Sequence, residues 1–290
     1  MSVTIAETPV AARGGDRRAL PLIALGLPLV LIALLSLIAP LLPLDDPEQQ
    51  DLLNTLQPPA FSGGTWDHPL GTDKLGRDLL AQLVYGGRLT FLIGILGMLV
   101  AIVPGVLLGV LAGYRRGVFD LVVSRLVDAL LALPFVLVAI AIIANRGPSI
   151  GVLLIVLALT GWAQAARIVR AEALGLRERQ FVLALRAAGS SNTRIVARHI
   201  LPNLSGIIVV LATLQIGTAI LIESALSFLG LGVPPPGITW GAILSSGKDV
   251  IQEAWWISTF PGIAITVVVL LVNLLGDGLL TYYDPKKRRY

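Results

Sequence analysis

The chain has 290 residues, of which 55% are hydrophobic and 14% are charged, and its mean hydropathy is +0.83. This composition excludes an ordinary soluble globular protein. The net charge is +4 and cysteine is absent, which excludes disulfides, thiolate metal sites and cysteine nucleophiles. The two histidines, His68 and His199, lack a second histidine one helical turn away, so we expect no histidine metal site.

Long apolar stretches dominate the chain. A helix needs roughly 20 apolar residues to cross a hydrocarbon core of about 30 Å. Because backbone amides in lipid must be paired internally, continuous apolar stretches of about this length predict helices rather than barrel strands. The predicted fold class is an all-α membrane protein with six transmembrane helices. These helices are expected over residues 20–42, 89–112, 121–144, 150–168, 204–229 and 257–280.

The first apolar stretch, residues 20–42, follows several arginines and could therefore be taken for a signal peptide. However, it is longer than a typical signal-peptide core, and Pro40 and Pro43 stand where small cleavage-site residues would be expected. We therefore predict a membrane anchor that follows a cytoplasmic tail over residues 1–19.

Basic residues are distributed unevenly along the predicted topology. With the N-terminus inside, the inner segments and the inner end of the third span hold 17 of the 22 lysines and arginines. The first outer segment, residues 43–88, instead carries seven acidic residues. The positive-inside rule therefore places both termini, including a basic tail at 282–290, in the cytoplasm.

The two longest outer segments, residues 43–88 and 232–256, contain prolines and glycines typical of ordered loops. In the first segment, Thr72 or Asp73 is expected to cap a helix with a stripe of leucines. In the second segment, tandem tryptophans near its end suit an anchor at the membrane interface.

Two local patterns lie within the second and third predicted spans. Gly105, Gly109 and Gly113 form a small-residue face that permits close helix packing. We favour packing within the chain for this face, with a subunit interface as the alternative. Arg125 and Asp128 are separated by about one helical turn and are expected to form a local ion pair.

The cytoplasmic loop, residues 170–203, is the most arginine-rich connection in the chain. It is predicted to form two short helices with a break at Gly189, which suits the position after a helix C-terminus. Ser191 or Asn192 can cap the second helix. Pro202 is expected to end that helix before the fifth span begins.

Small and basic side chains share this loop. Ala184, Ala187 and Ala188 give the first short helix a small-residue face, and Arg186 lies on another side. A small-residue face lets another surface approach closely, and arginines can pair with acidic groups on that surface. A basic loop held to lipid headgroups is the alternative interpretation.

The spacing of Ala184, Gly189, Leu201 and Pro202 resembles the EAA loop of ABC importer permeases. Four further segments, in the same order along the chain, look like the C-type permease of dipeptide, oligopeptide and nickel importers. These segments are residues 68–78, 198–203, 226–232 and 273–278.

The resemblance implies a type I ABC importer permease with a five-span core over residues 89–281. It also implies that the loop contains a coupling helix, which sits in a groove of a cytoplasmic ATP-binding subunit. The residues expected to couple to the ATPase are Ala184, Arg186, Ala187, Ala188, Gly189, Ser190, Arg194, Leu201 and Pro202.

The loop departs from the family pattern at two positions. Leu183 stands where the family has a glutamate, and Leu185 replaces the second alanine of the signature. The polar contact of that glutamate is therefore absent or supplied by another residue, for which Glu178 is the candidate.

Residues 241–248 superficially suggest a phosphate-binding loop. Five residues rather than four separate the two glycines, and the segment is predicted on the extracytoplasmic side of the membrane, so we exclude this interpretation. The sequence has no other nucleotide motif, so we expect that the chain is not an enzyme and binds no cofactor. The resemblance implies that ATP and Mg²⁺ are bound by partner subunits.

Three polar residues, Glu223, Asn273 and Asp277, lie in or at the ends of predicted spans. Such residues in a membrane are candidates for a transport pathway or gate. The alternative is that they pair between helices or lie at the membrane interface.

The expected function is the permease subunit of an ATP-driven ABC importer for peptides or similar small solutes, in the plasma (inner) membrane of a prokaryote. The implied partners are a homologous B-type permease, two ATP-binding subunits and an extracytoplasmic solute-binding protein, with no nucleic acid. Peptides, nickel chelates and glutathione-like compounds remain open as cargo. A secondary transporter or channel driven by an ion gradient is the alternative, supported by Glu223.

Overall fold

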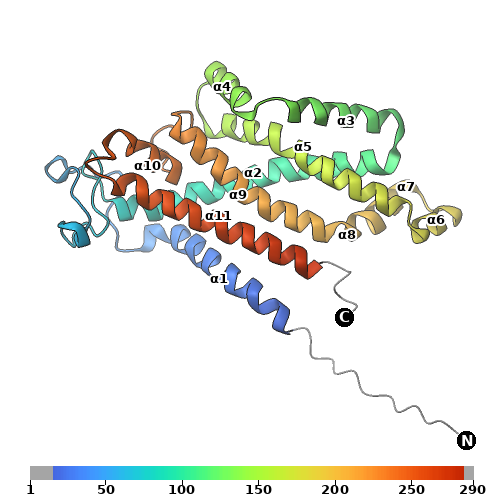
Figure 1. Cartoon of the computed structure of the whole chain (residues 1–290), viewed down its shortest axis with the longest axis horizontal. Helices are drawn as coiled ribbons and strands as arrows, with labels where there is room; N and C mark the ends of the chain where they lie inside the picture. The colour runs from blue at the N-terminus through green and yellow to red at the C-terminus, as the bar shows by residue number, and fades with distance from the viewer. Residues whose placement is uncertain (1–15, 284–290) are drawn as a thin grey trace, which may run out of the picture.

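The computed structural model describes residues 16–283, and within this range it consists of helices and connecting loops (Figure 1). The α-helices are α1 (Asp16–Leu37), α2 (Leu79–Arg115), α3 (Gly117–Ala132), α4 (Phe135–Arg146), α5 (Ile150–Arg177), α6 (Gln180–Ala187), α7 (Asn192–Ile195), α8 (Leu201–Asn203), α9 (Ser205–Phe228), α10 (Trp240–Ser246) and α11 (Trp256–Tyr283). Short 3-10 segments are η1 (Ala39–Leu41), η2 (Leu52–Asn54), η3 (Ala60–Ser62) and η5 (Lys248–Val250), and η4 (Val196–Ile200) is a π-helical segment. Arg13 and Lys286–Arg289, which contribute to the charge asymmetry, lie outside the described residues.

The all-helical membrane fold is confirmed. Four described helices are long and apolar enough to cross a membrane: α2, α5, α9 and α11. The bent pair α3 and α4 would make a fifth span. The described apolar part of α1, Leu22–Leu37, is shorter than these helices, so helix length alone does not identify it as the sixth predicted span.

The third predicted span is not one straight helix. The span predicted over residues 121–144 corresponds to two helices, because α3 ends at Ala132 and α4 begins at Phe135, with a bend of 87° between them. The break falls at Leu133, which has extended backbone angles, and at Pro134. A proline disfavours helical geometry in the residue before it, and this preference accounts for the bend.

Ion pairs join α3 to α5 rather than forming within α3. Asp128 accepts a hydrogen bond from Arg167 at 2.7 Å, so the expected local pair with Arg125 is wrong. Asp120 pairs with Arg170 through both carboxylate oxygens. The two arginines come from α5, which contacts α3 along its length, and this long-range contact overrides the local spacing.

The most closely packed pair of helices is α2 and α5. A Cβ atom added at Gly105, Gly109 or Gly113 would lie 2.8, 2.7 or 2.6 Å from a backbone carbonyl oxygen of α5. Real Cβ atoms essentially never approach other atoms this closely, so glycine is required at all three positions. The preferred prediction, packing within the chain, is confirmed for this face.

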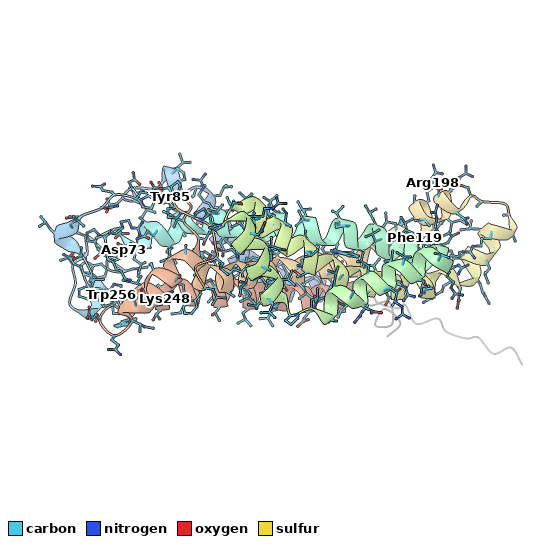
Figure 2. The ribbon with its side chains drawn as sticks, turned by 90° about the horizontal axis from the view of Figure 1, so that it is seen from above. Asp73, Tyr85, Phe119, Arg198, Lys248 and Trp256 are labelled. Carbon is cyan, nitrogen blue, oxygen red and sulfur yellow. The ribbon has the colours of Figure 1, made fainter. Side chains whose placement is uncertain are left out.

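The long helices run side by side along the long axis of the molecule (Figure 1). The short helices α6, α7 and α8 lie at one end, and α10 lies at the other with the loops that precede α2. Figure 2 shows the same division, with Phe119 and Arg198 towards one end and Asp73 and Trp256 at the other. In Figure 1, α1 begins and α11 ends on the side of the bundle that carries α6–α8.

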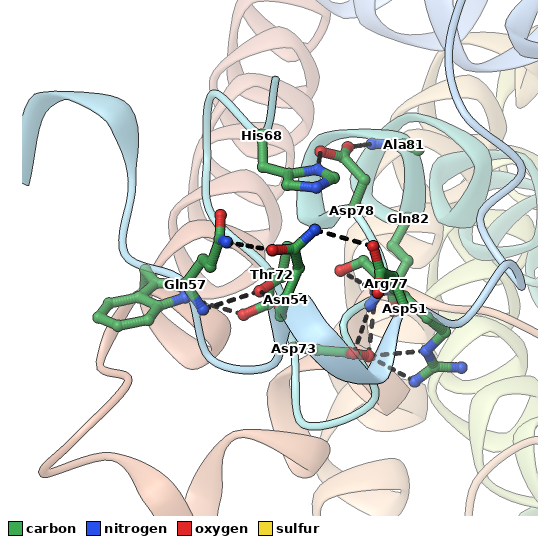
Figure 3. A network of polar contacts seen from close by, with 11 residues as sticks. Asp51, Asn54, Gln57, His68, Thr72, Asp73, Arg77, Asp78, Ala81 and Gln82 are labelled. Carbon is green, nitrogen blue, oxygen red and sulfur yellow. Dashed lines mark hydrogen bonds and ion pairs between the residues drawn. The ribbon is translucent and has the colours of Figure 1, made fainter. Parts of the chain in front are cut away.

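A polar turn precedes α2 at the end that carries α10 (Figure 3). The buried carboxylate of Asp73 accepts four hydrogen bonds of 2.7–3.1 Å. The donors are the backbone N–H groups of Leu75 and Arg77 and the side chains of Arg77 and Gln82. The indole N–H of Trp256 also donates to the carbonyl oxygen of Thr72, which fastens the start of α11 to the turn.

The cap of α2 is Asp78, not Thr72 or Asp73 as predicted. Its carboxylate accepts a hydrogen bond from the backbone N–H of Ala81 at 2.7 Å, and α2 begins at Leu79. Thr72 and Asp73 lie in the preceding turn because a bridge between Thr72 and Asp78 folds the chain back before the helix starts. The helix is therefore capped by an acidic side chain five residues after Asp73.

We expect Gly109→Ala to destabilise the protein by about 1–3 kcal/mol, because the added methyl group would overlap the backbone of Ala166. Gly175→Ala is the matched control, since a Cβ at that position on α5 meets nothing within 4 Å and alanine favours a helix by up to about 1 kcal/mol. Thermal unfolding in detergent measures both variants. Equal melting temperatures would contradict the packing argument.

The two ends of the molecule should react from opposite sides of the membrane. The natural chain has no cysteine, so Leu53→Cys and Leu183→Cys, at side chains that are 95% and 51% exposed, would each supply one reactive thiol. A membrane-impermeant maleimide added to intact spheroplasts should label Leu53→Cys only, and Leu183→Cys should react after permeabilisation. Val103→Cys, also at a position 51% exposed but midway along α2, should stay unlabelled in both conditions.

Candidate functional site: the loop between α5 and α9

The first short helix of the loop ends in a glycine-dependent turn. The backbone N–H of Ser190 donates to the carbonyl oxygen of Leu185, and that of Gly189 donates to Arg186, both at 3.0 Å. Gly189 has a φ of +78°, which side-chain-bearing residues rarely adopt. This is the Schellman arrangement of a helix C-terminus, and the predicted role of Gly189 is confirmed.

The second helix of the loop begins with a side-chain cap. Ser191 accepts a hydrogen bond from the backbone N–H of Arg194 at 3.4 Å, so Ser191 rather than Asn192 is the cap. The helical path then continues through η4 and α8 into α9, without the break that was predicted at Pro202. A proline ring clashes with the carbonyl four residues earlier, and the wider turn of a π-helix accommodates it.

Three side chains anchor the loop to the membrane helices. Val182, Ile195 and Ile200 are fully buried, and they pack in one apolar cluster with Val169 and Ala173 of α5. Burying three aliphatic side chains stabilises the loop by roughly 5–9 kcal/mol, on the usual scale of about 1.5–3 kcal/mol each. The loop is therefore a firm extension of the bundle rather than a flexible connection.

The opposite side of the loop is open. Of the nine residues expected to couple to an ATPase, seven are exposed: Ala184, Ala187, Ala188, Gly189, Arg194, Leu201 and Pro202. Arg186 and Ser190 are half-buried. The structure thus brings these residues onto one end of the molecule, where α6, α7 and α8 lie (Figure 1).

The position of the missing glutamate is also at the surface. Leu183 is exposed, as is Phe181 two residues earlier, so this part of α6 presents apolar side chains where a carboxylate was expected. The carboxylate of Glu178, the candidate for supplying that contact, pairs with Arg116 at the end of α2 and stays largely exposed. Any surface that covers α6 must therefore accept a leucine rather than a carboxylate.

A tyrosine of α2 contacts both short helices of the loop. The hydroxyl of Tyr114 donates to Oδ1 of Asn192 at 2.8 Å and accepts from Nε of Arg186 at 3.3 Å. The guanidinium of Arg186 also lies over the tyrosine ring, 4.8 Å from its centroid, in cation–π geometry. Sequence reasoning missed Tyr114, because it is separated from these partners by more than 70 residues.

The polar residues of the spans are not gathered into one site. Glu223 is fully buried, and its carboxylate accepts hydrogen bonds of 2.7 Å from the hydroxyls of Ser227 and Thr239. Asn273 and Asp277 are exposed and lie one turn apart on α11. The structure therefore separates an enclosed carboxylate near α10 from an exposed pair on a different helix.

The Glu223 carboxylate fastens α10 to the bundle. Thr239, which donates to Glu223, also caps α10 by accepting from the backbone N–H of Ala242. Gly241 comes so close that a Cβ there would lie 3.1 Å from Oε2 of Glu223. This geometry favours packing rather than pathway for Glu223.

Asp45, His68 and Asp78 meet beside the polar turn, with one ligand atom of each within 4.8 Å of the others. The spacing argument against a histidine metal site does not cover this set, because its members come from three separate segments. The contact between His68 Nδ1 and Asp78 Oδ2, at 3.0 Å, is accounted for as a hydrogen bond that ties the loop to the α2 cap. We assign no metal to it.

The sequence of the chain is similar to those of known transport proteins. Residues 105–289 match the family model of binding-protein-dependent transport system inner membrane components. The chain belongs to this family. It is thus a multi-pass component of the inner membrane and a subunit of a transport system.

Several curated relatives are similar over almost the whole chain. The di/tripeptide transport system permease protein DppC of Pseudomonas aeruginosa is 42% identical over 259 residues, covering 89% of this chain and 86% of the relative. The dipeptide permease DppC of Bacillus subtilis is 37% identical, with 90% and 80% covered. The oligopeptide permease OppC of the same organism is 36% identical, with 90% and 84% covered. The resemblance to C-type permeases is thereby confirmed.

We expect Glu223→Leu in this permease to destabilise the attachment of α10, because the hydroxyls of Ser224, Ser227 and Thr239 would lose their acceptor, at about 1–3 kcal/mol for each of the two short bonds. Hydrogen exchange at the backbone of α10 should accelerate, and the melting temperature should fall. Glu223→Gln keeps an oxygen acceptor at the same place and should remain close to the natural protein. If Glu223→Gln and Glu223→Leu lower the melting temperature equally, the charge of Glu223 rather than its hydrogen bonds stabilises the attachment of α10.

Proposed function

We propose that this chain is the C-type membrane subunit of an ATP-driven ABC importer for di- or oligopeptides. Relatives 36–42% identical over about nine-tenths of the chain are peptide transport permeases, which supports peptides as the cargo. The observation that carries the mechanism is the loop between α5 and α9, where an exposed small-residue surface stands on a buried aliphatic base.

The proposed topology has six spans and both termini in the cytoplasm. The arginine-rich loop supports placing α6–α8 inside, because basic residues gather on the cytoplasmic side. The start of α1 and the end of α11 point towards that same end, which agrees with inner termini (Figure 1). We count α1 and the bent pair of α3 and α4 as one span each.

The proposed partners follow the organisation of such a transporter. A homologous B-type permease would complete the pathway, two ATP-binding subunits would dock on the two permeases, and an extracytoplasmic binding protein would deliver the peptide. ATP and Mg²⁺ would be bound by the ATP-binding subunits, and this chain would bind no cofactor and catalyse no hydrolysis.

In the proposed mechanism, ATP-driven closure of the ATP-binding subunits moves α6–α8 as a unit. The loop resists deformation because Val182, Ile195 and Ile200 are buried in the bundle, so the movement passes to the membrane helices. The helices then shift between inward- and outward-facing arrangements, which links the two sites through a two-state element.

Ala184→Glu tests the coupling surface. The position is exposed, so the variant should fold, but a carboxylate in a closely packed interface should lower peptide uptake by more than about tenfold. Uptake of a labelled peptide by membranes with the complete transporter measures this loss, and co-purification of the ATP-binding subunits should fall in parallel.

Ala171→Glu is the matched control for this experiment. Ala171 is equally an exposed alanine, but it lies on α5, before the short helices α6–α8, beside Glu172, which already places a carboxylate there. It should transport normally. Full uptake and normal co-purification in Ala184→Glu would overturn the assignment of the loop, whereas transport by the purified chain without ATP-binding subunits would favour an ion-driven carrier.

A further inference from the structure

We propose that Tyr114 is the positioning residue through which movement of the loop between α5 and α9 enters α2. The proposal rests on the function proposed above. Tyr114 lies outside the loop, at the C-terminal end of α2, and contacts both α6 and α7.

The hydroxyl of Tyr114 connects the two short helices of the loop. Its hydroxyl donates to Asn192 at the start of α7 and accepts from Arg186 near the end of α6. Between those two residues the chain passes through the turn at Gly189. The single phenol oxygen therefore fixes the angle between α6 and α7, an angle that the glycine turn alone leaves adjustable.

The environment of Tyr114 makes this link stiff. The side chain is only 3% exposed and packs in the same apolar cluster as Val182 and Ile195. The Arg186 guanidinium lies over its ring, so the arginine is held both by the ring face and by the hydroxyl. A displacement of α6 or α7 must therefore displace Tyr114, or break contacts with both helices.

Tyr114 belongs to a helix that reaches the other end of the molecule. At 1.5 Å per residue, the 37 residues of α2 extend over about 55 Å. At its far end, Trp240 of α10 donates through its indole N–H to the carbonyl oxygen of Leu83, at 2.7 Å, and through its backbone N–H to Thr90. One helix thus contacts the loop at its last turn and α10 near its first.

A buried tyrosine could serve packing alone, and the hydroxyl distinguishes the two roles. Tyr114→Phe keeps the ring, its burial and the cation–π contact with Arg186, but removes both hydrogen bonds. A packing role depends on the ring, whereas a positioning role depends on the oxygen that connects α6 to α7.

The experiment uses the complete transporter in lipid nanodiscs with peptide-loaded binding protein. We expect Tyr114→Phe to lower the stimulation of ATP hydrolysis by loaded binding protein by about fivefold, a coupling loss of about 1 kcal/mol. The basal ATPase rate, the melting temperature and the co-purification of ATP-binding subunits should stay unchanged. A packing defect would instead lower the last two.

Two comparisons make the result specific. Asn192→Ala removes the acceptor and should also lower the stimulation, and the double variant should lose no more than Tyr114→Phe alone, because both single changes break the contact between Tyr114 and Asn192. Asn192→Asp keeps an acceptor oxygen and should stay near the natural protein. Tyr85→Phe is the matched control, the same change near the other end of α2.

Each outcome bears on a different claim. If loaded binding protein stimulates ATP hydrolysis equally in the natural transporter and in Tyr114→Phe, the positioning role is overturned and the proposed function remains. Additive losses in the double variant also overturn it. If the natural transporter shows no stimulation by peptide-loaded binding protein, the proposed function fails and this inference fails with it.

Discussion

The contact between the backbones of α2 and α5 is the constraint on which the rest of the structure depends. Three glycines on α2 allow the carbonyl oxygens of α5 to come where a side chain would otherwise stand. Lipid tails provide no hydrophobic driving force between helices, so close van der Waals packing of this kind holds a membrane bundle together. Because α5 leads into the loop at α6, and Tyr114 lies in the last turn of α2, the same contact sets the base on which the loop stands.

The loop and the opposite end of the molecule, which carries α10, are stabilised by different physical means. At the loop, buried aliphatic side chains anchor short helices whose other surface remains open. At the opposite end, buried carboxylates hold the segments together, with Asp73 and Glu223 each surrounded by hydrogen-bond donors. A buried polar group that is fully satisfied specifies one arrangement, because every alternative leaves a donor or acceptor unpaired.

Sequence reasoning succeeded where a single local constraint decides the outcome. The all-helical membrane fold follows from the requirement that backbone amides be paired in lipid, and the turn at Gly189 follows from the ability of glycine to adopt a positive φ. It failed where a distant partner decides. Asp128 pairs with α5 rather than with Arg125, and the cap of α2 moved to Asp78 because the preceding turn folds back. The links made by Tyr114 could not be read from the sequence, because nothing local predicts which residues 70 positions away will meet it.

The bend between α3 and α4 has a consequence for the surrounding bilayer. At 16 residues, α3 is about 24 Å long, which is less than the hydrocarbon thickness of about 30 Å. A short helix makes the bilayer thin locally, at a cost that grows with each ångström of mismatch. Because α3 alone falls short of this thickness, either the bilayer beside it thins or α4 contributes to the crossing in spite of the 87° bend.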